Sequence, residues 1–130
     1  MKTINSEKIL DDSALLVSET DEKGKIIYAN DLFLSLSEYS LEELIGKPHN
    51  IIRHPDMPKA TFKDLWETIK KGEVWKGFVK NHTKNKNFYW AYAVVFPYGE
   101  KHYLSVRKMA TKEEIVKYEK LYKTMKEEER

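Results

Sequence analysis

Hydrophobic and polar residues alternate along five short stretches of the sequence, and this pattern predicts a β-sheet. We expect strands at residues 14–19, 26–29, 74–81, 88–96 and 102–109. Residues 21–24 end in a glycine and join the first two strands as a tight turn, because glycine accepts a positive φ at low cost. The last three strands follow one another through residues 82–87 and 97–100, as expected for antiparallel hairpins.

The region between the second and third strands carries helical signals. Asn30 offers a side-chain cap to a short helix over 32–37, and Ser40 with Glu43 forms a capping-box pattern for another that stops at Gly46. A longer amphipathic helix is expected over 60–71, with Phe62, Leu65, Trp66 and Ile69 on one face. Strands interrupted by a block of helices indicate an α+β fold, and short helices leave room for a cavity against the sheet.

Residues 49–58 concentrate chemically versatile side chains on a stiff backbone. Pro55 and Pro58 prevent a long helix, so we expect at most one helical turn over 49–52 and then a bend. A stiff segment that carries Arg53 suits an anionic or heteroaromatic ligand. The alternative is a surface connection in which Arg53 and Asp56 pair only with each other.

The strand over 75–81 separates its side chains onto two faces. Trp75, Gly77 and Asn81 share one face and lysines occupy the other, which we expect to be the wetter one. Asn81 should therefore point towards the helices, where a buried amide without a partner would cost about 1–3 kcal/mol. Gly77 would leave room for a flat ring, and Trp75 would offer that ring a stacking surface. The alternative is that Trp75 is an ordinary core residue.

A helix is expected near the C-terminus, because Thr111 and Glu114 form a second capping-box pattern. Its apolar stripe consists of Ile115, Tyr118, Tyr122 and Met125. The stripe forms either an intermolecular seam, with a possible homodimer, or a contact with the sheet of its own domain. The expected organisation is a cap or arm at 1–13, a ligand-binding domain at 14–110, and a signalling or dimerisation helix at 111–130.

Composition narrows the possible environments and partners. The 130 residues, 41% hydrophobic, suffice for one domain with a real core, and the net charge is +2. No cysteine is present, which excludes disulfides, thiolate metal sites and a thiol nucleophile. The longest apolar run, 90–96, is too short to span a bilayer, so we expect a soluble, cytoplasmic domain. The small net charge and the missing glycine-aromatic strand signature argue against nucleic-acid binding.

Several motifs taken together resemble a PAS domain, and specifically the flavin-binding PAS domain of Aer-type aerotaxis receptors. The resembling segments are 27–31, 39–44, 46–50, 53–60, 71–73, 79–81, 84–85, 89–90, 105–107, 110–111 and 113–115, together with Trp75 and Gly77. The resemblance covers residues 14–124, and the block from His49 to Ala60 is the most distinctive. It implies a PAS fold, in which short helices on one face of a five-stranded antiparallel sheet enclose a ligand cavity, with a C-terminal helix added.

The resemblance also implies a function. Domains of this family bind FAD non-covalently, and the flavin redox state is passed to a chemoreceptor or another signalling protein. The positions of the family that lie near the cofactor correspond here to Asn30, Arg53, His54, Asp56, Trp75 and Asn81. The planar fork of Arg53 suits a diphosphate, and Asp56 could orient that arginine or accept from ribose hydroxyls.

Two departures from the family pattern affect the hairpins. Lys86 stands where the family usually carries glycine, and we expect Asn85 or Asn87 to take the positive φ instead. The connection over 96–101 is shorter than in better-known relatives. Both changes lie towards one end of the expected cavity.

Other readings of the sequence remain open. The main alternative is a cofactor-free PAS module that binds another protein. A haem sensor is a lesser one, with His49, His54, His82 and His102 as candidate axial ligands. A metal or acid–base cluster of His49, His54 and Asp56 lacks a nucleophile or a second carboxylate beside it, so no enzyme is expected.

Overall fold

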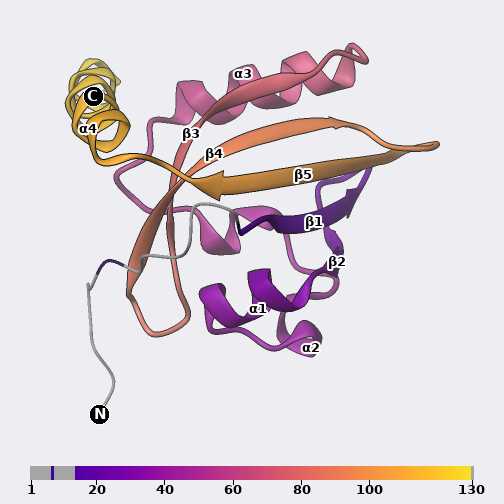
Figure 1. Ribbon diagram of the computed structural model, residues 1–130. Helices are drawn as coiled ribbons and strands as arrows, with labels where there is room; N and C mark the ends of the chain where they lie inside the picture. The colour runs from indigo at the N-terminus through magenta and orange to yellow at the C-terminus, as the bar shows by residue number, and fades with distance from the viewer. Residues whose placement is uncertain (1–6, 8–13, 130) are drawn as a thin grey trace.

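The computed structural model describes Glu7 and residues 14–129. Five antiparallel strands form one sheet in the order β2-β1-β5-β4-β3, as Figure 1 shows. The strands are β1 (Leu16–Asp21), β2 (Ile26–Ala29), β3 (Trp75–His82), β4 (Phe88–Pro97) and β5 (His102–Met109). β1 begins two residues later than expected, because its pairing with β5 starts where Leu16 faces Arg107.

Four short helical segments precede β3, and one long helix follows the sheet. They are α1 (Asp31–Ser37), α2 (Leu41–Leu44), the 3-10 helix η1 (His49–Ile52), α3 (Lys59–Lys70) and α4 (Lys112–Glu128). Asn30 caps α1 through its side chain, and both expected capping boxes are formed, at Ser40 for α2 and at Thr111 for α4. The prolines of 49–58 leave room for the single turn of η1, as predicted.

The inner face of the sheet carries the main core. Leu16, Val79 and Ala91 are fully buried there, and they belong to one cluster with Phe33 of α1 and Ile69 of α3. The predicted α+β fold, with short helices on one face of a five-stranded antiparallel sheet, is confirmed.

α4 covers part of the outer face, which we had expected to be wet. The ring of Tyr118 stacks on Phe78 with centroids 4.2 Å apart, and the Tyr122 hydroxyl donates to the Phe78 carbonyl at 2.6 Å. Lys80, on the same face, is only 9% exposed. The apolar stripe of α4 therefore packs on the sheet of its own domain, the second of the two alternatives.

The hairpin between β3 and β4 has no glycine, and its positive φ falls on a residue that we did not predict. Lys86 itself takes the positive φ, at 68°, so the prediction for Asn85 or Asn87 was wrong. The Asn87 amide nitrogen Nδ2 donates to Glu38 at 2.9 Å, and its backbone N–H donates to Thr83 Oγ1. Glu38, the C-cap residue of α1, thereby holds Asn87 in place, and the positive φ falls on the exposed residue before it, Lys86.

Most of the expected N-terminal arm, residues 1–13, lies outside the described residues. Glu7 forms a parallel bridge with Phe88 at the start of β4. Within residues 14–129, no helix combines the length and the apolar character needed to cross a membrane.

Candidate functional site

A cavity of about 470 Å³ lies between the inner face of the sheet and the helices η1 and α3. Its volume is in the range usual for small-ligand sites. The apolar part of the wall comes from Ile52, Phe62, Leu65, Trp66, Ile69 and Val95. The polar part comes mainly from β1, β3, β5 and η1, with Ser18, Thr20, His49, Asn81, Ser105 and Arg107.

The charges around this cavity are all of one sign. Arg107 and Arg53 line it together with three exposed lysines, Lys23, Lys59 and Lys63. No aspartate or glutamate is among the described residues of its wall. A cationic rim around an apolar interior favours a ligand that has a flat apolar part and an anionic part.

Arg107 is the most unusual residue of the wall. It is 4% exposed, its Nε donates to Ser105 Oγ at 2.9 Å, and burial lowers its pKa. Among the described residues no carboxylate pairs with it, although burying an uncompensated charge costs on the order of several kcal/mol. An electron-rich or anionic ligand atom in the cavity would offset that cost.

Asn81 connects this arginine to η1. With its amide oriented to satisfy both neighbours, Oδ1 accepts from Arg107 Nη1 at 2.9 Å and Nδ2 donates to the Ile52 carbonyl at 3.3 Å. Asn81 points towards the helices and has the polar partners that the sequence required of it.

His49 completes the polar wall as a neutral ring. Its Nε2 lies 2.9 Å from Ser18 Oγ, and its imidazole packs edge-on against Phe33. Burial, helped by the nearby Arg107 charge, lowers the pKa of His49 to about 3. The ring can therefore offer one donor and one acceptor at neutral pH, but no charge.

Two of the six predicted site residues, Arg53 and Asn81, are brought together at the cavity. Their backbones form an antiparallel bridge, which places the residue after η1 against β3. The Arg53 guanidinium carbon lies 4.7 Å from the centroid of the Phe62 ring. Arg53 is thus held at the wall by an aromatic face, and its donors stay available to a ligand.

Asn30 and Trp75 are used elsewhere. Asn30 Oδ1 accepts from Phe33 N at 3.0 Å and from Val17 N at 3.2 Å, so its side chain joins α1 to β1. Trp75 Nε1 donates to Asp64 at 2.9 Å, and its indole covers Gly77, where a Cβ would lie only 2.5 Å from the ring. The space above Gly77 is therefore filled by Trp75 itself and not by a ligand ring.

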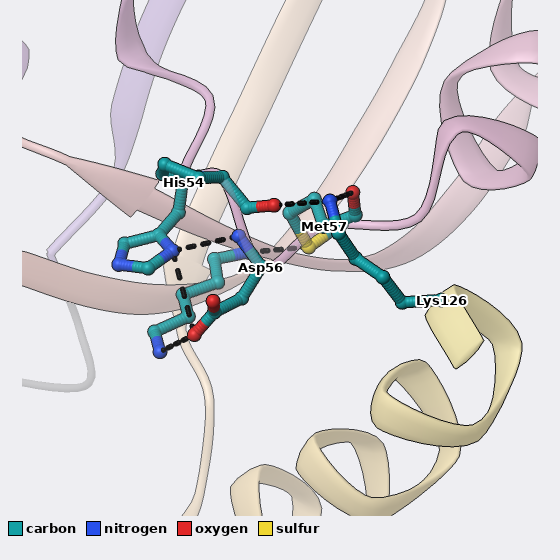
Figure 2. Close-up of polar contacts among 6 residues, drawn as sticks. His54, Asp56, Met57 and Lys126 are labelled. Carbon is teal, nitrogen blue, oxygen red and sulfur yellow. Dashed lines mark hydrogen bonds and ion pairs between the residues drawn. The ribbon is translucent and has the colours of Figure 1, made fainter. Parts of the chain in front are cut away.

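His54 and Asp56 are not part of this cavity wall. The His54 backbone N–H donates to the Lys80 carbonyl of β3 at 3.1 Å, and Figure 2 shows the His54 and Asp56 side chains next to each other. Asp56 Oδ2 pairs with Lys80 Nζ at 2.9 Å, so the expected contact between Arg53 and Asp56 was wrong. His54 Nδ1 accepts from the Asp56 backbone N–H at 3.0 Å, and burial, assisted by the Lys80 charge, lowers the pKa of His54 to about 4. Asp56 faces a second hollow of about 390 Å³ between the sheet and α4.

Sequence reasoning missed Ser18 and Arg107 as site residues. Only part of a signal was available for Arg107: alternation places it on the same strand face as Ser105, and the structure puts that strand between β1 and β4. A charged residue at such a position is rarely buried without a purpose. Ser18 carried no comparable signal, because its role depends on where η1 places His49.

The fold and the cavity together define a class of protein, a small α+β domain whose sheet and short helices enclose a space of ligand size. The family model described as the PAS fold matches residues 26–109. The chain therefore belongs to the PAS family.

Individual relatives agree with this assignment. The chain is 49% identical to the aerotaxis receptor of Escherichia coli K12 over 120 residues, which is 89% of this chain and 24% of that protein. It is 26% identical to the nitrogen fixation regulatory protein of Klebsiella oxytoca over 77% of this chain and 21% of that protein. The chain thus spans about a fifth to a quarter of these relatives.

Solved structures show the same fold. The light-state structure of the blue-light photoreceptor Aureochrome1 LOV superimposes with a TM-score of 0.70 at 20% identity. The match covers 86% of this chain and 91% of that one.

Proposed function

We propose that this PAS domain binds FAD non-covalently in the 470 Å³ cavity and passes the flavin redox state to a chemotaxis-type signalling partner. One observation carries the proposal: an apolar cavity has a cationic rim, a buried arginine without a carboxylate partner, and no acid in its described wall. In this proposal the domain is a cytoplasmic sensor and not an enzyme.

The rim fits the diphosphate of FAD. Arg53 can meet two phosphate oxygens at once through its fork, while Lys59 and Lys63, four residues apart on α3, add charge on one helix face. A flavin without phosphates would leave these cations without a partner.

The inner wall fits the polar edge of the flavin ring. Asn81, Arg107 and His49 present donors and acceptors between apolar side chains, as a ring with alternating carbonyls and nitrogens requires. Bound flavin would supply reversible electron transfer, which no side chain of this chain provides. Because both ends of the Asn81 amide are already engaged, a change at the ring would be passed on to Arg107 and to Ile52 of η1.

The partner is proposed from the similarity to an aerotaxis receptor, at 49% identity over 89% of this chain. A chemoreceptor or a comparable signalling protein would receive the signal, either in another chain or in further sequence. The proposed partner is a protein, and the proposal includes neither nucleic-acid binding nor a direct membrane span.

The test is the absorption spectrum of the purified protein, followed by reversible reduction. Oxidised flavin bands, with FAD identified after release from the protein, would support the proposal. A Soret band would favour haem, and a featureless visible spectrum after incubation with FAD would favour the cofactor-free interaction module. Of the four histidines, all of which the structure describes, His49 alone lines the cavity, so haem would depend on a ring already bonded to Ser18.

A further inference from the structure

The C-terminal end of α4 forms hydrogen bonds with the first turn of α3 through its C-cap residue, Glu129. The two carboxylate oxygens of Glu129 accept from the backbone N–H groups of Lys59 at 3.0 Å and of Ala60 at 2.9 Å. α3 needs such a partner, because its own N-cap residue is Pro58, which makes no side-chain cap. The hydrogen bonds from Ala60 and Lys59 hold the pKa of Glu129 below its ordinary value.

Lys126, one turn earlier on α4, holds the segment before α3. Its Nζ donates to the carbonyl of Pro55 and lies 3.5 Å from that of Met57. Figure 2 shows the Lys126 side chain extending from α4 to Met57, beside His54 and Asp56. We call the contacts of Lys126 and Glu129 with residues 55–60 the clasp.

The clasped segment is continuous with the cavity wall. Arg53 precedes it by two residues, Lys59 belongs to both, and Phe62 follows it by two. Pro55 and Pro58 fix two φ angles within it, so a displacement at one end is not absorbed easily before it reaches the other. Met57 anchors the middle, because its side chain is buried and its sulfur accepts from Lys80 N at 3.2 Å.

The clasp is also built so that it can open. Lys126 and Glu129 lie at the end of a helix whose last packed residues are Tyr122, which is buried, and Met125, which is partly buried against the core. Glu129 itself is exposed to solvent. Such terminal contacts open at low cost compared with the core. Residues 55–60 adjoin the cavity wall and are held on α4 by these terminal contacts. The segment can therefore exist in two arrangements, with the clasp closed or open.

We propose that closing of the clasp and binding of the ligand in the cavity favour each other, so that cavity occupancy sets whether the end of α4 stays on α3. The ligand in this inference is the one given under the proposed function. The clasp fixes residues 53–60 before binding, which lowers the conformational entropy that the ligand must remove. By reciprocity, the bound ligand stabilises the clasp by the same factor.

The test measures FAD affinity and amide hydrogen exchange in the full chain and in two single variants of it, Glu129→Ala and Lys126→Met. The matched controls are Glu128→Ala and Lys120→Met, which make the same changes on α4 away from the clasp. Glu129→Ala is decisive, because removing a negative charge near an anionic ligand should tighten binding by electrostatics alone, whereas the clasp predicts weaker binding.

We expect the FAD dissociation constant to rise about fivefold or more in both clasp variants and to stay unchanged in both controls. We also expect saturating FAD to slow hydrogen exchange at the Lys59 and Ala60 amides in the parent chain. Equal affinities in the parent and in Glu129→Ala would overturn the clasp alone. A parent chain that binds no FAD would overturn the proposed function, and the clasp proposal with it.

Discussion

At the scale of single residues, the cavity wall depends on polar groups that are buried or half-buried without a full set of partners. Arg107 has hydrogen bonds but no carboxylate, and His49 is kept neutral beside it. Arg53 rests on the Phe62 ring with its donors available. Such groups destabilise the empty domain and gain most when a ligand completes them, which is how a binding site differs from an ordinary core.

Arg53→Ala should lose FAD during purification while the domain stays folded. The substitution removes a bidentate phosphate contact at the cavity rim, and hydrogen bonds to charged groups are worth about 1.5–3 kcal/mol, or roughly 10- to 100-fold in affinity. Flavin content per protein and the circular-dichroism spectrum measure the two effects. Lys76→Ala, an exposed cation on β3 outside the cavity wall, is the control. Normal flavin occupancy in Arg53→Ala would show that another group binds the phosphates.

His49 should make the domain less stable in acid. Its pKa is about 3 when folded and about 6.5 when unfolded, so the unfolded chain binds the proton first. Stability present above pH 6.5 is therefore lost as the pH falls towards 3, at about 1.4 kcal/mol per pH unit for this one group. Urea denaturation at about pH 7 and about pH 5 measures the slope.

The variant that tests this slope is His49→Gln. It should reduce the pH dependence by about one proton, while His54, whose pKa is also lowered, keeps part of it. An unchanged slope in His49→Gln would mean that His49 is not buried as a neutral ring.

At the scale of elements, the short segments between the longer helices and strands determine where the side chains of the cavity lie. η1 places His49 and Arg53 because prolines on both sides limit it to one turn. The hairpin between β3 and β4 is attached to α1 through Glu38, which accepts from both Asn85 N and Asn87 Nδ2. This attachment fixes the end of β3 where Asn81 enters the cavity.

Lys86→Gly should stabilise the domain by about 1 kcal/mol. Lys86 adopts φ 68°, a left-handed conformation that costs a residue with a side chain roughly 1–2 kcal/mol more than glycine. Chemical denaturation measures the change in the free energy of unfolding. Lys76→Gly, in the extended backbone of β3, should instead destabilise it. A loss of stability in Lys86→Gly would contradict the conformation of this hairpin.

At the scale of the whole molecule, one sheet separates the cavity from α4. Signals from the inner face must therefore pass through the sheet or around its edge. In the clasp proposed above, the segment 53–60 takes the second route, since it touches the cavity at Arg53 and α4 at Met57. The outer face, with Phe78 and Trp90 under Tyr118 and Tyr122, anchors α4.

Tyr122→Ser should lower the stability of the domain by about 3–5 kcal/mol, without altering its oligomeric state. Tyr122 is 6% exposed, stacks on Trp90 and donates to Phe78, so its loss removes packing and leaves a carbonyl without its donor. Thermal melting and sedimentation measure stability and association. Lys120→Ser, on the exposed side of α4, is the control. Association in the parent that disappears in Tyr122→Ser, with unchanged melting, would restore the intermolecular seam.

The sequence by itself determined the elements and the face on which most of them are buried. Alternation, capping boxes, prolines and glycines act over a few residues, so the strands, η1, α3 and the inward direction of Asn81 could be predicted. The resemblance of residues 49–60 indicates the family and predicts Arg53 at the cavity, which it lines in the structure.

Only the tertiary structure decided which polar groups meet. Asp56 pairs with Lys80 instead of Arg53, Trp75 fills the space above its own Gly77, and Arg107 reaches Asn81 across the sheet. The apolar stripe of α4 fitted a partner or its own sheet equally well, and the structure places it on its own sheet. Trp75 and Gly77 are neighbours on β3, and there the packing of one side chain decides. The other contacts join distant segments and depend on the order of the strands, which local spacing does not contain.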